Sequence, residues 1–133
     1  QIKRTKFENK NKIIKNLKKN KNWKNQLIFI QEGAHVSANW FGLSILINNK
    51  YKKKKKKYIK FLEKKGIETR PIISGNFINQ PSFKLYNFKT NKNTLKNSQK
   101  VEDLGFFIGI QNKKITTKQL NYLSKNLLEI SKI

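Results

Sequence analysis

Four short apolar runs, separated by polar stretches, limit what this chain of 133 residues can fold into. The runs are rich in β-branched and aromatic residues, which favour strands. They span residues 26–30, 40–47, 67–73 and 106–110. Pro71 fits only an edge strand or the end of a strand, because proline cannot donate a ladder hydrogen bond. The runs therefore predict a small sheet.

The stretches around these runs place apolar residues at helical spacing. Helices are predicted at residues 1–20, 51–65 and 98–104, and from Thr116 to about residue 131. Thr116 followed by Gln119 is a capping box, which marks the start of the last helix. Residues 87–97 read as an exposed excursion. Helices among a few strands predict an α+β (α/β) fold, in which helices pack on a small, at least partly antiparallel sheet.

Three of the predicted helices have a defined apolar face, which in the last helix consists of Leu120, Leu123, Leu127 and Ile130. In the first helix it consists of Phe7, Ile13, Ile14 and Leu17. In the second it consists of Tyr51, Tyr58, Ile59 and Leu62. This second face leaves the six lysines 52–57 pointing mostly to water. They could grip phosphate groups, or they could be the solvated side of an amphipathic helix.

The charge of the chain is strongly positive, at +24, with 31 Lys and Arg against 7 Asp and Glu. Lysine, asparagine and isoleucine share A/T-rich codons, so genomic bias alone can produce this composition. The alternative is a small basic module that binds nucleic acid. Only Arg4 and Arg70 are arginines, and the scarcity of that bidentate side chain argues against specific nucleic-acid recognition.

Several kinds of chemistry are excluded by composition. The chain has no cysteine, which rules out disulfides and thiolate sites, and we expect no metal site. His35 is the only histidine and Asp103 the only aspartate, so a Ser-His-Asp triad would have to use both of them. Glu102 and Asp103 are neighbours on a predicted helix and therefore should not face each other. No apolar run is long enough to span a membrane. Since the chain lacks methionine, we expect Gln1 to begin a fragment or a processed piece.

The most informative segment runs from residue 67 to residue 81. Arg70 stands out against a background of lysine. Its planar fork could meet a carboxylate or phosphate, or it could pair with Glu68 on the surface. The following loop carries hydroxyl and amide groups at Ser74, Asn76, Asn79 and Gln80. Such groups could recognise sugar hydroxyls or satisfy the loop's own backbone.

Three blocks of sequence resemble a known family. WFGLSILI at 40–47, GIETRPIISGNFINQP at 66–81 and GFFIGI at 105–110 are similar to the C-terminal part of the DegT-type nucleotide-sugar aminotransferases. A branch of that family, the 4-keto-6-deoxy-sugar 3-dehydratases, carries similar motifs. The resemblance covers about residues 1–131. It implies the small C-terminal domain of a fold type I enzyme that uses pyridoxal 5'-phosphate.

This resemblance implies a domain division and a site. Residues 1–25 would lead from a large domain, and 26–133 would form the small domain. The large domain, upstream of Gln1, would hold the cofactor and the deciding residue, lysine for transamination or histidine for 3-dehydration. No catalytic or cofactor-binding residue is therefore expected here, and the isolated chain should be inactive. Substrate contacts are expected from Arg70, Asn76 and Gln80, while Trp40 and Phe41 should pack beside the site or in the core.

The resemblance also implies partners. They are a keto nucleotide-sugar as substrate, an amino donor such as glutamate, and a second copy in a homodimer. The intact enzyme would be cytoplasmic and would serve surface polysaccharide synthesis, by transamination in the first reading and by 3-dehydration in the alternative. Neither specific nucleic acid nor a membrane is expected as a partner.

Overall fold

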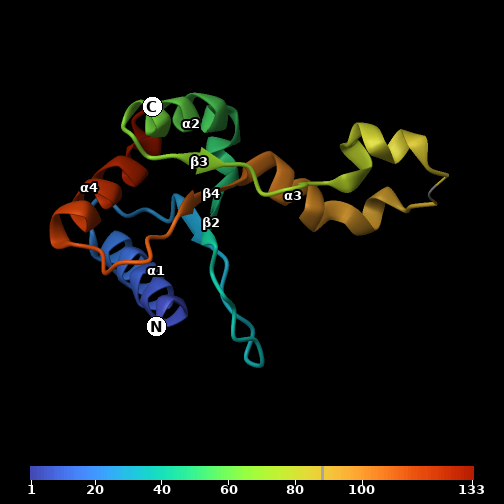
Figure 1. Ribbon diagram of the computed structural model, residues 1–133. Helices are drawn as coiled ribbons and strands as arrows, with labels where there is room; N and C mark the ends of the chain where they lie inside the picture. The colour runs from blue at the N-terminus through green and yellow to red at the C-terminus, as the bar shows by residue number, and fades with distance from the viewer. Residues whose placement is uncertain (88) are drawn as a thin grey trace.

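The fold is built on one four-stranded antiparallel sheet with the strand order β1-β2-β4-β3 (Figure 1). The computed structural model describes residues 1–87 and 89–133, apart from the side chain of residue 92. The strands are β1 (Leu27–Phe29), β2 (Gly42–Ile47), β3 (Thr69–Arg70) and β4 (Gly105–Gly109). All neighbouring strands run antiparallel, which agrees with the prediction of an at least partly antiparallel sheet.

The register places one apolar row of each strand toward the helices. Ile45 pairs with Phe29 of β1 and with Phe106 of β4, and these three side chains are buried. Leu43 and Ile47, two positions away from Ile45, are also fully buried. Since successive residues in a strand point to opposite faces, the residues between them lie on the other face of the sheet.

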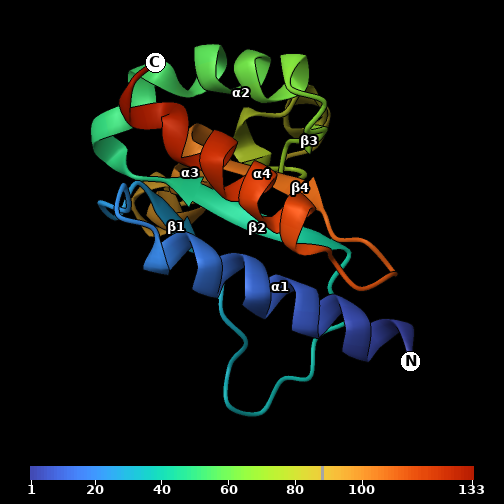
Figure 2. The same ribbon diagram turned by 90° about the vertical axis from the view of Figure 1, so that its left-hand side faces the viewer.

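Three helices cover this inner face, as Figure 2 shows. They are α1 (Ile2–Lys19), α2 (Lys55–Lys64) and α4 (Thr117–Leu127). A 3-10 turn, η1 (Asn49–Lys54), leads into α2, and another, η5 (Leu128–Ser131), follows α4. The helix α3 (Lys96–Leu104) lies on the opposite side, directly before β4. The short turns η2 (Phe77–Asn79), η3 (Pro81–Leu85) and η4 (Lys92–Leu95) project beyond α3.

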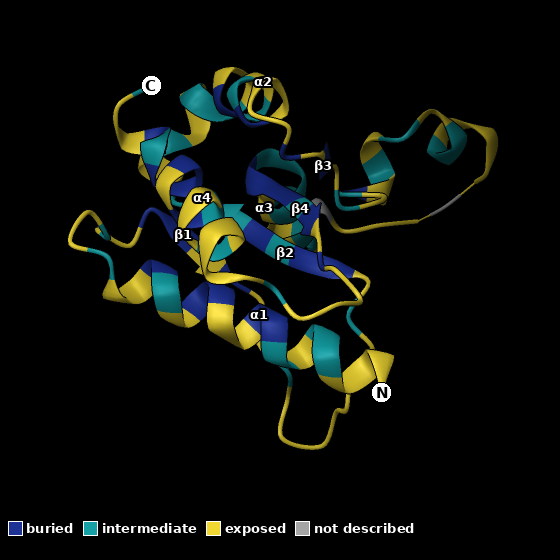
Figure 3. Ribbon diagram, turned by 60° about the vertical axis from the view of Figure 1, so that its left-hand side comes forward, coloured by how far each residue is buried: buried dark blue, intermediate teal, exposed yellow. Residues whose placement is uncertain are grey.

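The hydrophobic core fills the space between the helices and the inner face (Figure 3). Ile13 and Leu17 of α1 and Leu62 of α2 are nearly or completely inaccessible. Tyr58 is fully buried, and its hydroxyl donates a hydrogen bond of 2.7 Å to the carbonyl of Leu127. This bond ties α2 to the end of α4, because a buried hydroxyl needs a partner. Among the described residues, no helix is long and apolar enough to cross a bilayer.

The α+β class and the predicted helices are confirmed, with corrections of detail. The strand predicted at 67–73 is only two residues long, because Pro71 ends its pairing. Phe7 is 41% exposed and does not belong to the core. The helix predicted at 51–65 begins as the 3-10 turn η1 and becomes α-helical only at Lys55. The capping box of Thr116 and Gln119 is present.

The predicted excursion at 87–97 includes residue 88, which lies outside the described residues. The described residues after it form η4 and the start of α3. The helix predicted at 98–104 therefore begins two residues earlier, at Lys96.

Candidate functional site: the open face of the sheet and the loop 71–80

The sheet face opposite α1, α2 and α4 is only partly covered. The register places Phe107 of β4 between Ser44 of β2 and Arg70 of β3. Ser44 and Phe107 are half-buried and Arg70 is exposed, whereas the residues on the inner face are buried. This face is called the open face below.

An aromatic pair forms the floor of the open face. The rings of Phe41 and Phe107 meet edge to face, with their centroids 5.8 Å apart. Gly42 makes this possible, because a Cβ at that position would lie 2.6 Å from the Phe107 ring. Phe41 is 79% exposed and Ile73, which lines the same pocket of about 730 Å³, is 87% exposed. The pocket therefore offers an apolar surface to a ligand or to another part of a protein.

Trp40 lies away from this surface, against the core. Its indole N–H donates to the Glu32 carboxylate, and the ammonium of Lys10 lies 3.6 Å from the centre of the Trp40 ring. Lys10 is buried, and the loss of hydration lowers its pKa although Glu32 acts in the opposite direction. These contacts join α1 to the connection between β1 and β2. His35, in the same connection, is exposed.

Arg70 forms a surface ion pair with Glu68, which is one of the two alternatives that the sequence left open. Its Nε donates to Glu68 Oε1 at 2.9 Å, and its Nη2 donates to the same oxygen. Both side chains are more than 60% exposed, at 66% for Arg70 and 73% for Glu68. An ion pair this exposed contributes at most about 1 kcal/mol. A carboxylate or phosphate that reached the open face could therefore replace Glu68 at little cost.

The loop after Arg70 turns sharply at Gly75. Gly75 has a φ of +67°, and its N–H donates to the Ile72 carbonyl at 2.8 Å. A Cβ there would also come within 3.0 Å of the Glu102 Cβ. The turn predicted at Gly75 is therefore present, and both its backbone and its closeness to α3 require glycine.

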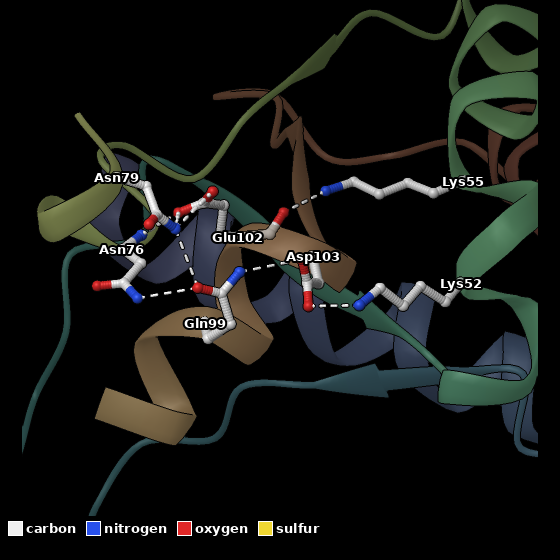
Figure 4. Close-up of polar contacts among 7 residues, drawn as sticks. All are labelled: Lys52, Lys55, Asn76, Asn79, Gln99, Glu102 and Asp103. Carbon is white, nitrogen blue, oxygen red and sulfur yellow. Dashed lines mark hydrogen bonds and ion pairs between the residues drawn. The ribbon is translucent and has the colours of Figure 1, made fainter. Parts of the chain in front are cut away.

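Two side chains of α3 hold this loop in place (Figure 4). The Glu102 carboxylate accepts the backbone N–H of Asn76 at 2.8 Å and the side-chain amide of Asn79 at 3.1 Å. The Gln99 side-chain oxygen accepts the amides of Asn76 and Asn79 at 3.0 and 2.9 Å. The amides of Asn76 and Asn79 are thus satisfied by a helix rather than by the loop itself. Sequence reasoning missed this role, although Gln99 and Glu102 stand three residues apart on one helical face.

The three predicted substrate contacts do not surround one cavity. Arg70 lies beside Phe41 on the open face. Gln80 is half-buried and donates to the carbonyl of Ser74 at 2.9 Å, beside a smaller pocket of about 250 Å³. Asn76 is 3% exposed and lies within the loop. The open face and the loop are therefore adjoining surfaces, with Asn76 buried in the loop.

The two neighbouring carboxylates of α3 point to different partners, as expected. Asp103 accepts a hydrogen bond from Lys52 at 2.6 Å and one from Gln99 at 3.1 Å. The bond from Lys52 holds the pKa of Asp103 below its usual range, against the opposing effect of partial burial. Glu102 faces the loop instead. Within the described part of the chain, no three metal-ligating side chains cluster together.

Comparison with known proteins identifies the class of proteins that share this fold. No protein-family model matches the chain. Its fold is that of a small domain of pyridoxal-phosphate-dependent enzymes: it matches the structure of E coli GDP-4-keto-6-deoxy-D-mannose-3-dehydratase with bound hydrated PLP. The TM-score is 0.77 at 25% identity, over 95% of this chain and 31% of the other. A structure of that dehydratase with a trapped PLP-glutamate geminal diamine matches at a TM-score of 0.75 and 26% identity, over 93% of this chain and 30% of the other.

Two curated proteins show the same relationship in sequence. GDP-4-keto-6-deoxy-D-mannose 3-dehydratase of Escherichia coli O55:H7 is 32% identical over 72 residues, which is 54% of this chain and 19% of that protein. The dTDP-4-dehydro-2,6-dideoxy-D-glucose 3-dehydratase of Saccharopolyspora spinosa is 28% identical over 95 residues, 71% of this chain and 20% of that protein. This chain thus spans about a fifth of the curated relatives it matches. The expected resemblance is confirmed, and these relatives favour its dehydratase branch over the aminotransferase reading.

The residues described here do not make a complete pyridoxal-phosphate site. Such a site needs a phosphate cup, a partner for the pyridine nitrogen and a base beside the reacting carbon. Lys10 is a buried lysine, but its ammonium lies against the Trp40 ring and not in the open face. Glu68, the acid beside the open face, is already paired with Arg70. No catalytic step on the cofactor is therefore assigned to the described residues of this chain.

Proposed function

We propose that this chain forms the small domain of a pyridoxal-phosphate-dependent nucleotide-sugar 3-dehydratase. The observation that carries the proposal is the match of 95% of the chain to a solved 3-dehydratase, joined by two curated relatives that are also 3-dehydratases. The substrate would be a keto sugar linked to a nucleotide, as the names of those relatives state for them. Glutamate would supply an amino group to the cofactor, since one matched structure holds a PLP-glutamate adduct.

In this proposal the open face and the loop form one wall of the active site. Arg70 releases Glu68 and binds a carboxylate or phosphate of the substrate or amino donor. Gln80 contacts hydroxyl groups of the sugar. Asn76 shapes the loop through its amide nitrogen and offers its side-chain oxygen, which points away from Gln99 in Figure 4. The role of Phe41 is to exclude water beside the site.

The remaining parts of the proposal concern the intact protein. Residues 1–25 would connect the small domain to the larger part that the relatives contain, with α1 anchored by Ile13 and Leu17. The cofactor and the residue that acts on it would belong to that larger part. The enzyme would be a cytoplasmic homodimer that serves surface polysaccharide synthesis.

The proposal is tested first on the gene. Sequencing the DNA upstream of the codon for Gln1 should reveal an open frame that brings the protein to the length of its relatives. Histidine at the cofactor position would support 3-dehydration, and lysine would support transamination instead. A stop codon directly upstream would contradict the enzyme reading.

The protein encoded by the extended frame is then assayed with pyridoxal phosphate, glutamate and GDP-4-keto-6-deoxy-D-mannose. We expect loss of the 3-hydroxyl group, and Arg70→Gln should raise the KM for the sugar or for glutamate about tenfold. Arg4→Gln is the matched control, because Arg4 also pairs with a glutamate, Glu8, but does not line the pocket at Phe41 and Arg70. Equal effects of the two substitutions would contradict the role of Arg70.

A further inference from the structure

A pocket of about 550 Å³ lies between α1, α4 and the segment that joins α2 to β3. Its volume falls in the range of roughly 300–1,000 Å³ that is typical of small-molecule sites. The pocket lies on the inner side of the sheet, where α1 and α4 pack against each other (Figure 2). Glu68 and residues 109–111 also border the pocket at Phe41, but the apolar wall comes from the helix-covered side. The proposed function makes no use of this wall.

The interior of the pocket is apolar. Its lining contains the aliphatic side chains of Ile13, Ile67, Ile108, Ile110, Ile115 and Leu123. Asn9, a polar residue of the lining that is only 1% exposed, already has its partners. Its amide nitrogen donates to the carbonyls of Gln111 and Lys113 at 3.0 and 2.8 Å, and its oxygen accepts the N–H of Ile115 at 3.0 Å. The interior therefore offers a ligand apolar contacts rather than hydrogen bonds.

The mouth of the pocket carries two donor groups from α4 that have no acceptor. Lys118 is exposed and, in the part of the chain that the structure describes, makes no hydrogen bond or ion pair. The side-chain oxygen of Gln119 accepts the N–H and the hydroxyl of Thr116, both at 3.0 Å. The amide nitrogen of Gln119 is left without an acceptor among the described residues. An ammonium and an amide N–H side by side suit an anionic acceptor.

Two further groups at the mouth are already engaged. The hydroxyl of Tyr122 donates to the carbonyl of Lys65 at 2.8 Å, so its ring borders the pocket in a fixed position. The carboxylate of Glu68 is paired with Arg70, which offsets its negative charge. The free polar groups are therefore concentrated at the start of α4.

We propose that this pocket binds a medium-chain carboxylate. The hydrocarbon chain lies against the aliphatic interior, and the carboxylate accepts hydrogen bonds from Lys118 and from the amide of Gln119. The net charge of +24 also favours an anion over a cation. A sugar or a nucleotide does not fit, because its polar groups would lose their hydration against the isoleucines. The proposal rests on the pocket alone and does not depend on the proposed enzymatic function.

The test is titration of the 133-residue chain with octanoate at about 150 mM salt, followed by NMR. We expect one saturable site, with NOEs from the octanoate chain to the methyl groups of Ile108, Ile115 and Leu123. Hexanoate should bind about tenfold more weakly, because each buried CH2 contributes about fourfold. The uncharged 1-octanol, which has a chain of the same length, should bind about three- to fivefold more weakly than octanoate.

A pair of variants locates the carboxylate. Lys118→Gln removes the ammonium at the mouth, so it should weaken octanoate binding about three- to fivefold and leave 1-octanol binding unchanged. The matched control is Lys125→Gln. Lys125 is an exposed lysine on the same face of α4, two turns or about 10 Å further along, and does not line the pocket. This control should change octanoate binding by less than about 1.5-fold.

Several outcomes would overturn the proposal. The absence of saturable octanoate binding would do so directly, and NOEs to Phe41 and Ile73 would place the ligand on the open face instead. Equal losses in the two variants would show that the overall charge attracts the anion. Equal binding of octanoate and 1-octanol would show that the pocket does not select a carboxylate. A dimer that octanoate dissociates in sedimentation would assign the pocket to a second copy of the chain.

Discussion

The contact between Glu102 and the loop 71–80 leads to the sharpest prediction. Replacing Glu102 with alanine should loosen the loop while leaving the sheet intact. The carboxylate accepts the backbone N–H of Asn76, a residue only 3% exposed, and the amide of the more exposed Asn79. The substitution removes both acceptors but no part of the hydrophobic core. Its effect should therefore be local.

The size of the effect follows from the two hydrogen bonds. A buried donor that loses a charged acceptor costs about 1.5–3 kcal/mol. The amide of Asn79 adds little, because it is exposed and can bond to water instead. A total of about 2–3 kcal/mol corresponds to an opening of the loop that is about 30 to 150 times more frequent. Glu102→Gln should show a smaller increase, since the neutral side chain still offers one oxygen.

Amide hydrogen exchange, read residue by residue by NMR, measures this opening directly. We expect the Asn76 N–H to exchange about 30 to 150 times faster in Glu102→Ala, with the amides of β4 unchanged. The matched control is Glu8→Ala, which removes the same charge from an exposed pair with Arg4. An unchanged rate at Asn76, or equal acceleration throughout β4, would refute the reasoning.

Three further predictions concern the core, the sheet and α3. Tyr58→Phe removes the buried hydrogen bond to the Leu127 carbonyl, which should cost about 1 kcal/mol and lower the Tm by about 4 °C in thermal unfolding. Gly42→Ala places a Cβ 2.6 Å from the neighbouring ring and should cost about 2–3 kcal/mol in denaturant unfolding, whereas Gly109→Ala, with nothing within 4 Å, should change stability by less than about 0.5 kcal/mol. Lys52→Gln should raise the pKa of Asp103 in an NMR titration, because the bond from Lys52 is the main cause of its lowering. Because the folded state lowers the pKa of Asp103, the ionised carboxylate stabilises the fold at pH values above its unfolded pKa. This stabilisation is lost as the pH falls through the folded pKa. The variant lacks most of it and should therefore lose less stability on acidification.

Local patterns in the sequence were sufficient to predict most of the elements. The capping box at Thr116 uses side chains three residues apart, so its geometry is contained in the sequence. Pro71 correctly indicated an edge strand, because its effect on pairing is local. Phe7 shows where spacing fails: it continues the apolar row of Ile14, but the covering layer does not extend that far along α1, and the ring stays 41% exposed.

Only part of the candidate site could be predicted, because local sequence patterns do not show which distant segments lie together. The turn at Gly75 could be predicted, because a positive φ favours glycine wherever it occurs. Its support could not, because Gln99 and Glu102 approach the loop from a helix more than twenty residues later in the chain. The alternative uses of Arg70 also depended on distance in space, and the structure places the arginine against Glu68.

The two faces of the sheet differ in the residues they carry, and for this reason the overall composition of the chain says little about where a binding surface lies. The inner face is uniformly apolar, so it determines the fold whatever the surface charge may be. Most of the lysines that the structure describes are exposed and lie outside it. A lysine marks a candidate binding surface only where a second element lies opposite it. Examples are Lys52, which lies opposite α3, and Lys60, which lies opposite β3. The position of a charge in the fold, rather than the total of +24, therefore identifies the surfaces that merit mutation.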